Sequence, residues 1–120
     1  MSRFMVVLLV TAVLLVACGG TDSLTADAGD DFSVKMGEQP HFDGCASTGN
    51  ITNYKWTIVN APQEMSEDVG KVIRETEPEC AFTLDAQMGV DEVGVWEVQL
   101  EVQNDAGDTA VDTVNVTVMQ

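Results

Sequence analysis

Strict alternation of apolar and polar residues dominates the chain beyond Asp27, and it limits the fold more than any other feature. The longest run carries Trp96, Val98, Leu100 and Val102, with Glu or Gln at each position between them. Successive side chains of a β-strand point to opposite faces, so this period of two predicts strands with one buried and one solvated face. Helical periodicity is scarce. An all-β fold is therefore expected.

Seven segments carry this strand signal, and turns rich in Gly, Asn, Asp and Pro separate them. Each sheet built from such strands has one apolar face, which a second sheet must cover. The pattern therefore predicts an antiparallel β-sandwich of about seven strands. The expected strands are Phe32–Met36, His41–Asp43, Tyr54–Ile58, Gly70–Ile73, Cys80–Leu84, Trp96–Gln103 and Val114–Val118.

The N-terminus has the composition of an export signal. Arg3 supplies one positive charge, and the segment from Met5 to Val16 is apolar except for Thr11. This apolar run is well short of the ~20 residues that span a bilayer. Residues 1–17 are therefore interpreted as a signal peptide.

Leu15-Val16-Ala17-Cys18 resembles the lipobox of bacterial lipoproteins. The resemblance implies cleavage before Cys18 and a diacylglyceryl group on its sulfur, which anchors the protein to the cell membrane or outer membrane because two acyl chains bind stably. Ordinary secretion without a lipid is the alternative. Residues 18–27 are polar and lack periodicity, so they are expected to form a flexible tether before a domain at residues 28–119.

The chain is strongly acidic. Without the first 17 residues, four basic residues stand against 20 acidic ones, a formal charge of −16. Phosphate binding needs clustered Lys and Arg, so nucleic acid is excluded as a partner, and so is electrostatic binding to an anionic membrane.

Six motifs follow one another along the chain: Ala28–Asp31, Gly37-Glu38, Phe42–Ser47, Ile51–Trp56, Val93–Trp96 and Leu100–Asn104. In order and spacing they resemble the PKD (polycystic kidney disease) domain over residues 28–118. That family is an immunoglobulin-like sandwich of cell-surface and secreted proteins, so the resemblance implies a noncatalytic module that binds a protein or glycan of the envelope or matrix.

Three departures from the family pattern affect the expectations. Cys45 stands where the family usually has Ser, and Trp96 stands where it usually has Tyr. The hydrogen bond of a tyrosine corner is therefore expected to be absent, with Trp96 acting by packing alone. The loop Ser47–Asn50 lacks the carboxylates that many members carry there. The segment Val69–Arg74 is interpreted as strand D, within a region that otherwise forms a loop or a short helical turn.

The topology implied by the resemblance places the end of strand B near Cys45 and the start of strand E near Cys80, in antiparallel neighbours. We therefore predict a Cys45–Cys80 disulfide, and lipidation of Cys18 leaves these two as an even pair in an oxidising compartment. One point opposes the bridge: Cys45 is out of phase with the inward-facing Phe42. A bulge at Gly44 would repair the phase. Two free buried thiols are the alternative.

Aspartates are expected to gather at the pole where the chain enters the sandwich. Oxygen ligands from several loops could hold Ca²⁺, as in some PKD-like domains, but a solvated acidic surface is the favoured interpretation, and neither a metal site nor a cofactor is predicted. These aspartates are Asp27, Asp30, Asp31, Asp43, Asp105 and Asp108.

Catalysis is not expected. His41 is the only histidine and is predicted to face solvent, and no nucleophile motif or phosphate-binding Gly loop is present. The aromatic residues beyond the leader all fall at core-facing positions, so none is left to stack on a sugar. The predicted function is a lipid-anchored, extracytoplasmic interaction module; the alternatives are a Ca²⁺-binding structural module and an accessory subunit of a surface complex.

Overall fold

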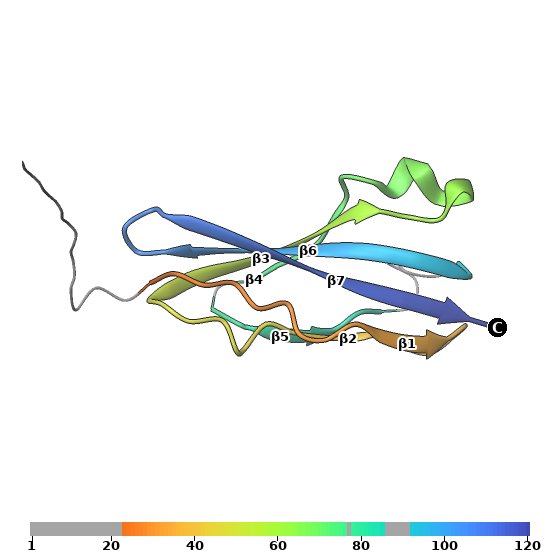
Figure 1. Cartoon of the computed structure of the whole chain (residues 1–120), viewed down its shortest axis with the longest axis horizontal. Coiled ribbons are helices and arrows are strands. Elements are labelled where there is room, and N and C mark those ends of the chain that lie inside the picture. Colours follow the sequence, from red (N-terminus) through yellow and green to blue (C-terminus); the bar gives the residue numbers. More distant parts are fainter. Residues whose placement is uncertain (1–22, 77, 86–91) are drawn as a thin grey trace, which may run out of the picture.

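The computed structural model describes residues 23–76, 78–85 and 92–120 (Figure 1). The predicted signal peptide, Cys18 and the first half of the predicted tether lie outside the described residues. In the described part of the chain, no helix is long and apolar enough to cross a membrane. The elements are β1 (Phe32–Lys35), β2 (His41–Asp43), β3 (Ile51–Asn60), the 3₁₀-helix η2 (Gln63–Asp68), β4 (Val72–Thr76), β5 (Ala81–Thr83), β6 (Gly94–Asn104) and β7 (Thr109–Met119).

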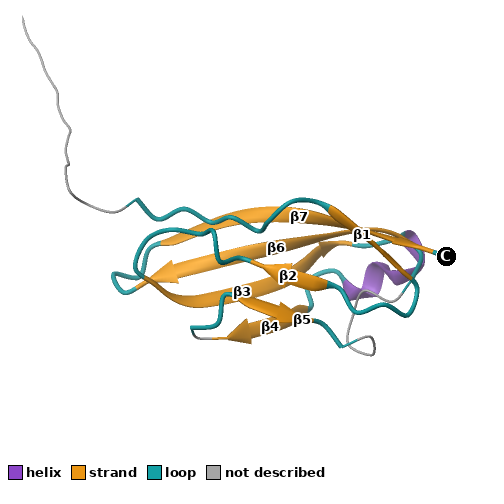
Figure 2. Ribbon diagram, turned by 90° about the horizontal axis from the view of Figure 1, so that it is seen from below, coloured by secondary structure: helices purple, strands orange, loops and turns teal. Residues whose placement is uncertain are grey.

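The strands form two facing sheets, which confirms the predicted β-sandwich. One sheet has five strands in the order β1-β7-β6-β3-β4, and the other consists of β2 and β5 (Figures 1 and 2). All pairs are antiparallel except β1 with β7, which is parallel from Phe32–Val116 to Lys35–Met119. Nearly the whole domain connects β1 to β7, so this pair needs no hairpin and can run in the same direction.

The placement of β4 corrects the interpretation of Val69–Arg74 as strand D. β4 pairs with β3 in the five-stranded sheet, with Trp56 opposite Arg74, and not with β5. The Ile58 N–H donates to Lys71 O at 2.9 Å, and the Gly70 N–H donates to Ile58 O at 2.7 Å. Because only a short segment containing η2 separates β3 from β4, the chain folds back beside β3 and extends the larger sheet.

Alternating burial along the long strands produces the core. Every second side chain is buried over Tyr54–Ile58 of β3, Trp96–Val102 of β6 and Val114–Val118 of β7, as the sequence pattern predicts. Phe42, Trp56 and Phe82 fill the space between the sheets, with ring centroids 5.2 to 5.7 Å apart. The predicted strand Phe32–Met36 ends one residue earlier than expected, at Lys35, and Met36 is exposed.

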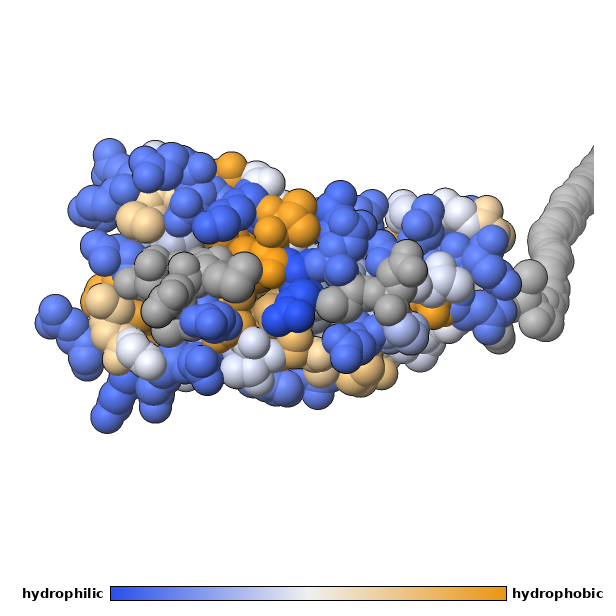
Figure 3. All heavy atoms as spheres, turned by 180° about the vertical axis from the view of Figure 1, so that it is seen from behind, coloured by the Kyte–Doolittle hydropathy of each residue, from blue (hydrophilic) through white to orange (hydrophobic). Residues whose placement is uncertain are grey.

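The surface is mainly polar. The face drawn in Figure 3 is largely hydrophilic, with a small hydrophobic area near its middle. The large hydrophobic residues recorded as exposed are Met36, Val69, Val72, Val93, Val95, Val111 and Met119.

Candidate functional site

A disulfide joins Cys45 and Cys80, whose Cα atoms lie 4.9 Å apart. β2 and β5 pair so that Asp43 lies opposite Ala81, which brings the residues just outside both strands together. β2 ends at Asp43, so the alternation of that strand does not extend to Cys45 and the expected conflict of phase does not arise. The β2–β5 register contains no bulge.

Gly44 lies between the disulfide and the core. Its N–H donates to Cys80 O at 2.7 Å. A Cβ atom at this position would lie 2.7 Å from Leu100 Cδ2 and 3.1 Å from Trp56 Cζ2. Only glycine therefore lets the backbone at position 44, next to the disulfide, approach Trp56 this closely.

Three of the six expected aspartates share one shallow pocket. Asp27, Asp30 and Asp43 line a hollow of about 370 Å³ beside Cys45. Two of these carboxylates are occupied by loop amides: Asp27 Oδ1 accepts the Gly29 N–H and Asp43 Oδ1 accepts the Cys45 N–H, both at 2.9 Å. These two hydrogen bonds therefore stabilise the turns that contain Asp27 and Asp43.

The other three aspartates do not line that pocket. Asp31 Oδ1 accepts the Asn115 N–H at 2.9 Å and ties β1 to β7. Asp105 and Asp108 lie in the turn between β6 and β7. Within residues 23–76, 78–85 and 92–120, no group of three or more His, Cys, Asp or Glu side chains is arranged to hold a metal ion.

Asp112 is a structural residue that the sequence did not reveal. Its Oδ2 accepts the N–H of the buried Ala28 at 2.8 Å and fastens the entering chain to β7. Thr25 and Thr48 add a β-bridge beside it. The only signal in the sequence is a charged residue amid the β-branched residues of a strand, which does not name its partner.

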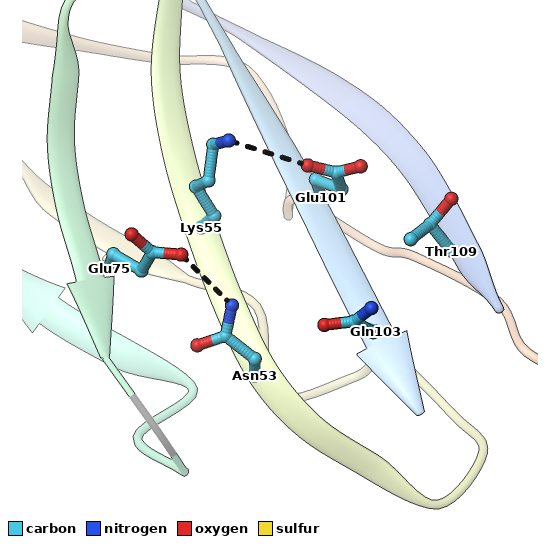
Figure 4. A pocket seen from close by; sticks show the side chains of 6 residues that line it. All are labelled: Asn53, Lys55, Glu75, Glu101, Gln103 and Thr109. Carbon is cyan, nitrogen blue, oxygen red and sulfur yellow. Dashed lines mark hydrogen bonds and ion pairs between the residues drawn. The ribbon is translucent and has the colours of Figure 1, made fainter. Parts of the chain in front are cut away.

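The outer face of the five-stranded sheet holds a second hollow, of about 150 Å³ (Figure 4). Lys55 Nζ lies 3.8 Å from Glu101 Oε1, and Asn53 Nδ2 donates to Glu75 Oε2 at 3.3 Å. The ion pair is partly exposed and therefore weak. Gln103 and Thr109 complete the lining.

His41 lies apart from both hollows. It is exposed, as expected, and its Nδ1 is 3.0 Å from Thr83 Oγ1. In the described residues this contact brings no acid or nucleophilic cysteine to the imidazole, so the arrangement does not form a catalytic dyad or triad.

Trp96 makes the hydrogen bond that was expected to be absent. Its indole Nε1–H donates to the backbone oxygen of Glu92, four residues earlier, at 2.9 Å. In a tyrosine corner the phenol bonds to the backbone a few residues upstream. The expectation that Trp96 acts by packing alone is wrong, because the indole N–H reaches an equivalent backbone acceptor.

Comparison with known structures agrees with this geometry. Over 81% of this chain and 87% of the other, the chain resembles the solution structure of the PKD domain from the KIAA 1837 protein, with 23% identity and a TM-score of 0.56. The fold is that of a PKD-like, immunoglobulin-type sandwich. The PKD-like chain also resembles the fibronectin(III)-like modules of Clostridium thermocellum CbhA, with 17% identity and a TM-score of 0.52 over 82% of this chain and 98% of that one. No protein-family model and no curated protein sequence matches.

Proposed function

We propose that this chain is a noncatalytic interaction module, held outside the cytoplasm of a bacterium by a lipid on Cys18. The proposal rests on the role of four aspartate carboxylates, which bind backbone amides of the domain itself. Asp27, Asp31, Asp43 and Asp112 each accept a backbone N–H within the sandwich. These carboxylates maintain the fold, and the long outer face of the five-stranded sheet is left available for a partner.

The anchor rests on the Leu15-Val16-Ala17-Cys18 motif behind the apolar leader. The Cys45–Cys80 bridge supports an extracytoplasmic location, because structural disulfides persist mainly in oxidising compartments. A protein partner is favoured over a glycan. Phe42, Trp56 and Trp96 are buried, and glycan binding by stacking needs exposed rings.

The test uses the full-length tagged protein in the bacterium that produces it. We expect the protein to fractionate with membranes and to retain at least one partner in mild detergent. The Cys18→Ser variant should leave the membrane fraction while keeping its fold. A monomer that enriches no partner would contradict the interaction role, and a stoichiometric complex would identify the chain as an accessory subunit.

A further inference from the structure

An apolar corner lies on the outer face of the five-stranded sheet, where β6 begins and β7 ends. Val93, Val95 and Met119 are 42%, 56% and 44% exposed. Val95 pairs with Thr117, and continuing this antiparallel register places Val93 opposite Met119. The three side chains therefore share one face. Met36, 45% exposed, follows the end of β1, and its N–H donates to Met119 O at 2.6 Å, which places its backbone at the edge of this face. We call Val93, Val95 and Met119 the distal corner.

Acidic residues lie at the same end of the sandwich as the distal corner. Pro62 lies against Gly94 at the start of β6, which places η2 and its carboxylates at this end of the sandwich. Lys35, opposite Met119, and Lys71 are the cations that the described chain places there. The carboxylates at this end are Glu38 in the turn after β1, Glu64, Glu67 and Asp68 in η2, and Glu92 and Glu97 around the start of β6.

The distal corner faces away from the membrane if the chain is anchored as proposed, and the inference rests on that proposed function. Cys18 precedes Ser23 by five residues, and a segment of that length spans at most about 18 Å. The described chain begins at the end of the sandwich that carries the β6–β7 turn, and η2 and the C-terminus lie at the opposite end (Figure 1). The short connection therefore holds the β6–β7 end near the lipid.

We propose that the distal corner binds a partner protein whose surface has an apolar centre surrounded by Lys and Arg. Burial of exposed Val and Met side chains supplies the affinity, and the acidic surroundings select a basic partner through complementary charge. A second copy is disfavoured because each chain without its leader has a charge of −16, with four basic and 20 acidic residues. An anionic lipid surface is repelled in the same way.

The structure provides a matched control position. Val111 lies on the same outer face and is 57% exposed, against 56% for Val95, but it pairs with Glu101 toward the other end of β7. A photoreactive phenylalanine analogue is introduced at Val95 or at Val111 in the full-length, membrane-bound protein. We expect an adduct from the Val95 position to one partner protein, identified by mass spectrometry of the linked peptide, and none from the Val111 position.

Binding of the identified protein, purified, then tests the chemistry. Val95→Asp combined with Met119→Asp should weaken its binding about tenfold or more, whereas Val111→Asp should leave it unchanged. Added salt should weaken binding to the unsubstituted chain. Equal melting temperatures of the variants establish that the fold is intact, since all three positions are exposed.

The outcomes separate this inference from the proposed function. Adducts only from the Val111 position would overturn the distal corner and leave the interaction module standing. An adduct to a second copy, to lipid or to an acidic partner would overturn the stated partner chemistry. Absence of any adduct from a protein that still fractionates with membranes would overturn the distal corner but not the anchor.

Discussion

The indole Nε1–H of Trp96 donates to the carbonyl oxygen of Glu92 at 2.9 Å and closes the start of β6 onto the preceding loop. Trp56 is equally buried, but its Nε1 has no hydrogen-bond partner among the described residues. The two tryptophans thus occupy one core in opposite hydrogen-bonding states. This contrast allows the hydrogen bond to be measured apart from packing.

Trp96→Phe and Trp56→Phe remove the same atoms from two fully buried side chains. Both should lower the free energy of unfolding by about 2 kcal/mol through lost packing. Trp96→Phe should cost about 1 kcal/mol more, because Glu92 O loses its donor. Urea unfolding of the two variants gives the comparison. An equal loss, or a larger one for Trp56→Phe, would show that the Trp96 bond does not stabilise the fold.

Replacing Cys45 and Cys80 together by Ala should destabilise the domain by about 4 kcal/mol, because the disulfide lowers the conformational entropy of the unfolded chain. The cysteines are 35 residues apart in sequence. Equilibrium unfolding with and without reductant measures the effect. The double variant should not respond to reductant, and an original protein that also failed to respond would argue for two free thiols.

Gly44→Ala should lower the free energy of unfolding by about 1–3 kcal/mol, because the new methyl would lie 2.7 Å from Leu100 Cδ2. Adding Leu100→Val, which withdraws the side-chain end, should recover part of the loss. A double-mutant cycle by thermal unfolding tests this coupling. Strictly additive effects would place the strain of Gly44→Ala elsewhere.

Calcium should leave the melting temperature unchanged. Asp27 and Asp43 each direct one carboxylate oxygen to a loop N–H, and a ligand that binds only the folded state would raise its stability. Thermal unfolding in chelator and in millimolar Ca²⁺ makes the comparison. A saturable rise that Asp27→Asn or Asp43→Asn abolished would establish the calcium-binding alternative.

The sequence predicted those parts of the fold that depend on burial alone. Val98, Leu100 and Val102 alternate with polar residues because one face of β6 covers the core, so the pattern reports the structure directly. The three-residue strand β2 could be predicted for the same reason, because Phe42 is buried between two exposed neighbours.

Features that depend on a specific partner could not be predicted in this way. The sequence pattern of β4 would be the same beside β3 or beside β5, because alternation specifies which face is buried and not which strand is the neighbour. The bonds from Trp96 to Glu92 and from Ala28 to Asp112 require loop conformations that carry no hydrophobic period. Exposed Met36 shows the same limit, because a strand pattern does not mark where pairing stops.

The measurement that tests the account most directly is the intact mass of the protein extracted from membranes. We predict a chain that begins at Cys18 and carries a diacylglyceryl group, with the mass of one disulfide and no free thiol. Cys18→Ser should abolish the lipid mass and release the protein from the membrane. An extracted chain that retains its leader, or that begins at Cys18 without a lipid, would contradict the account.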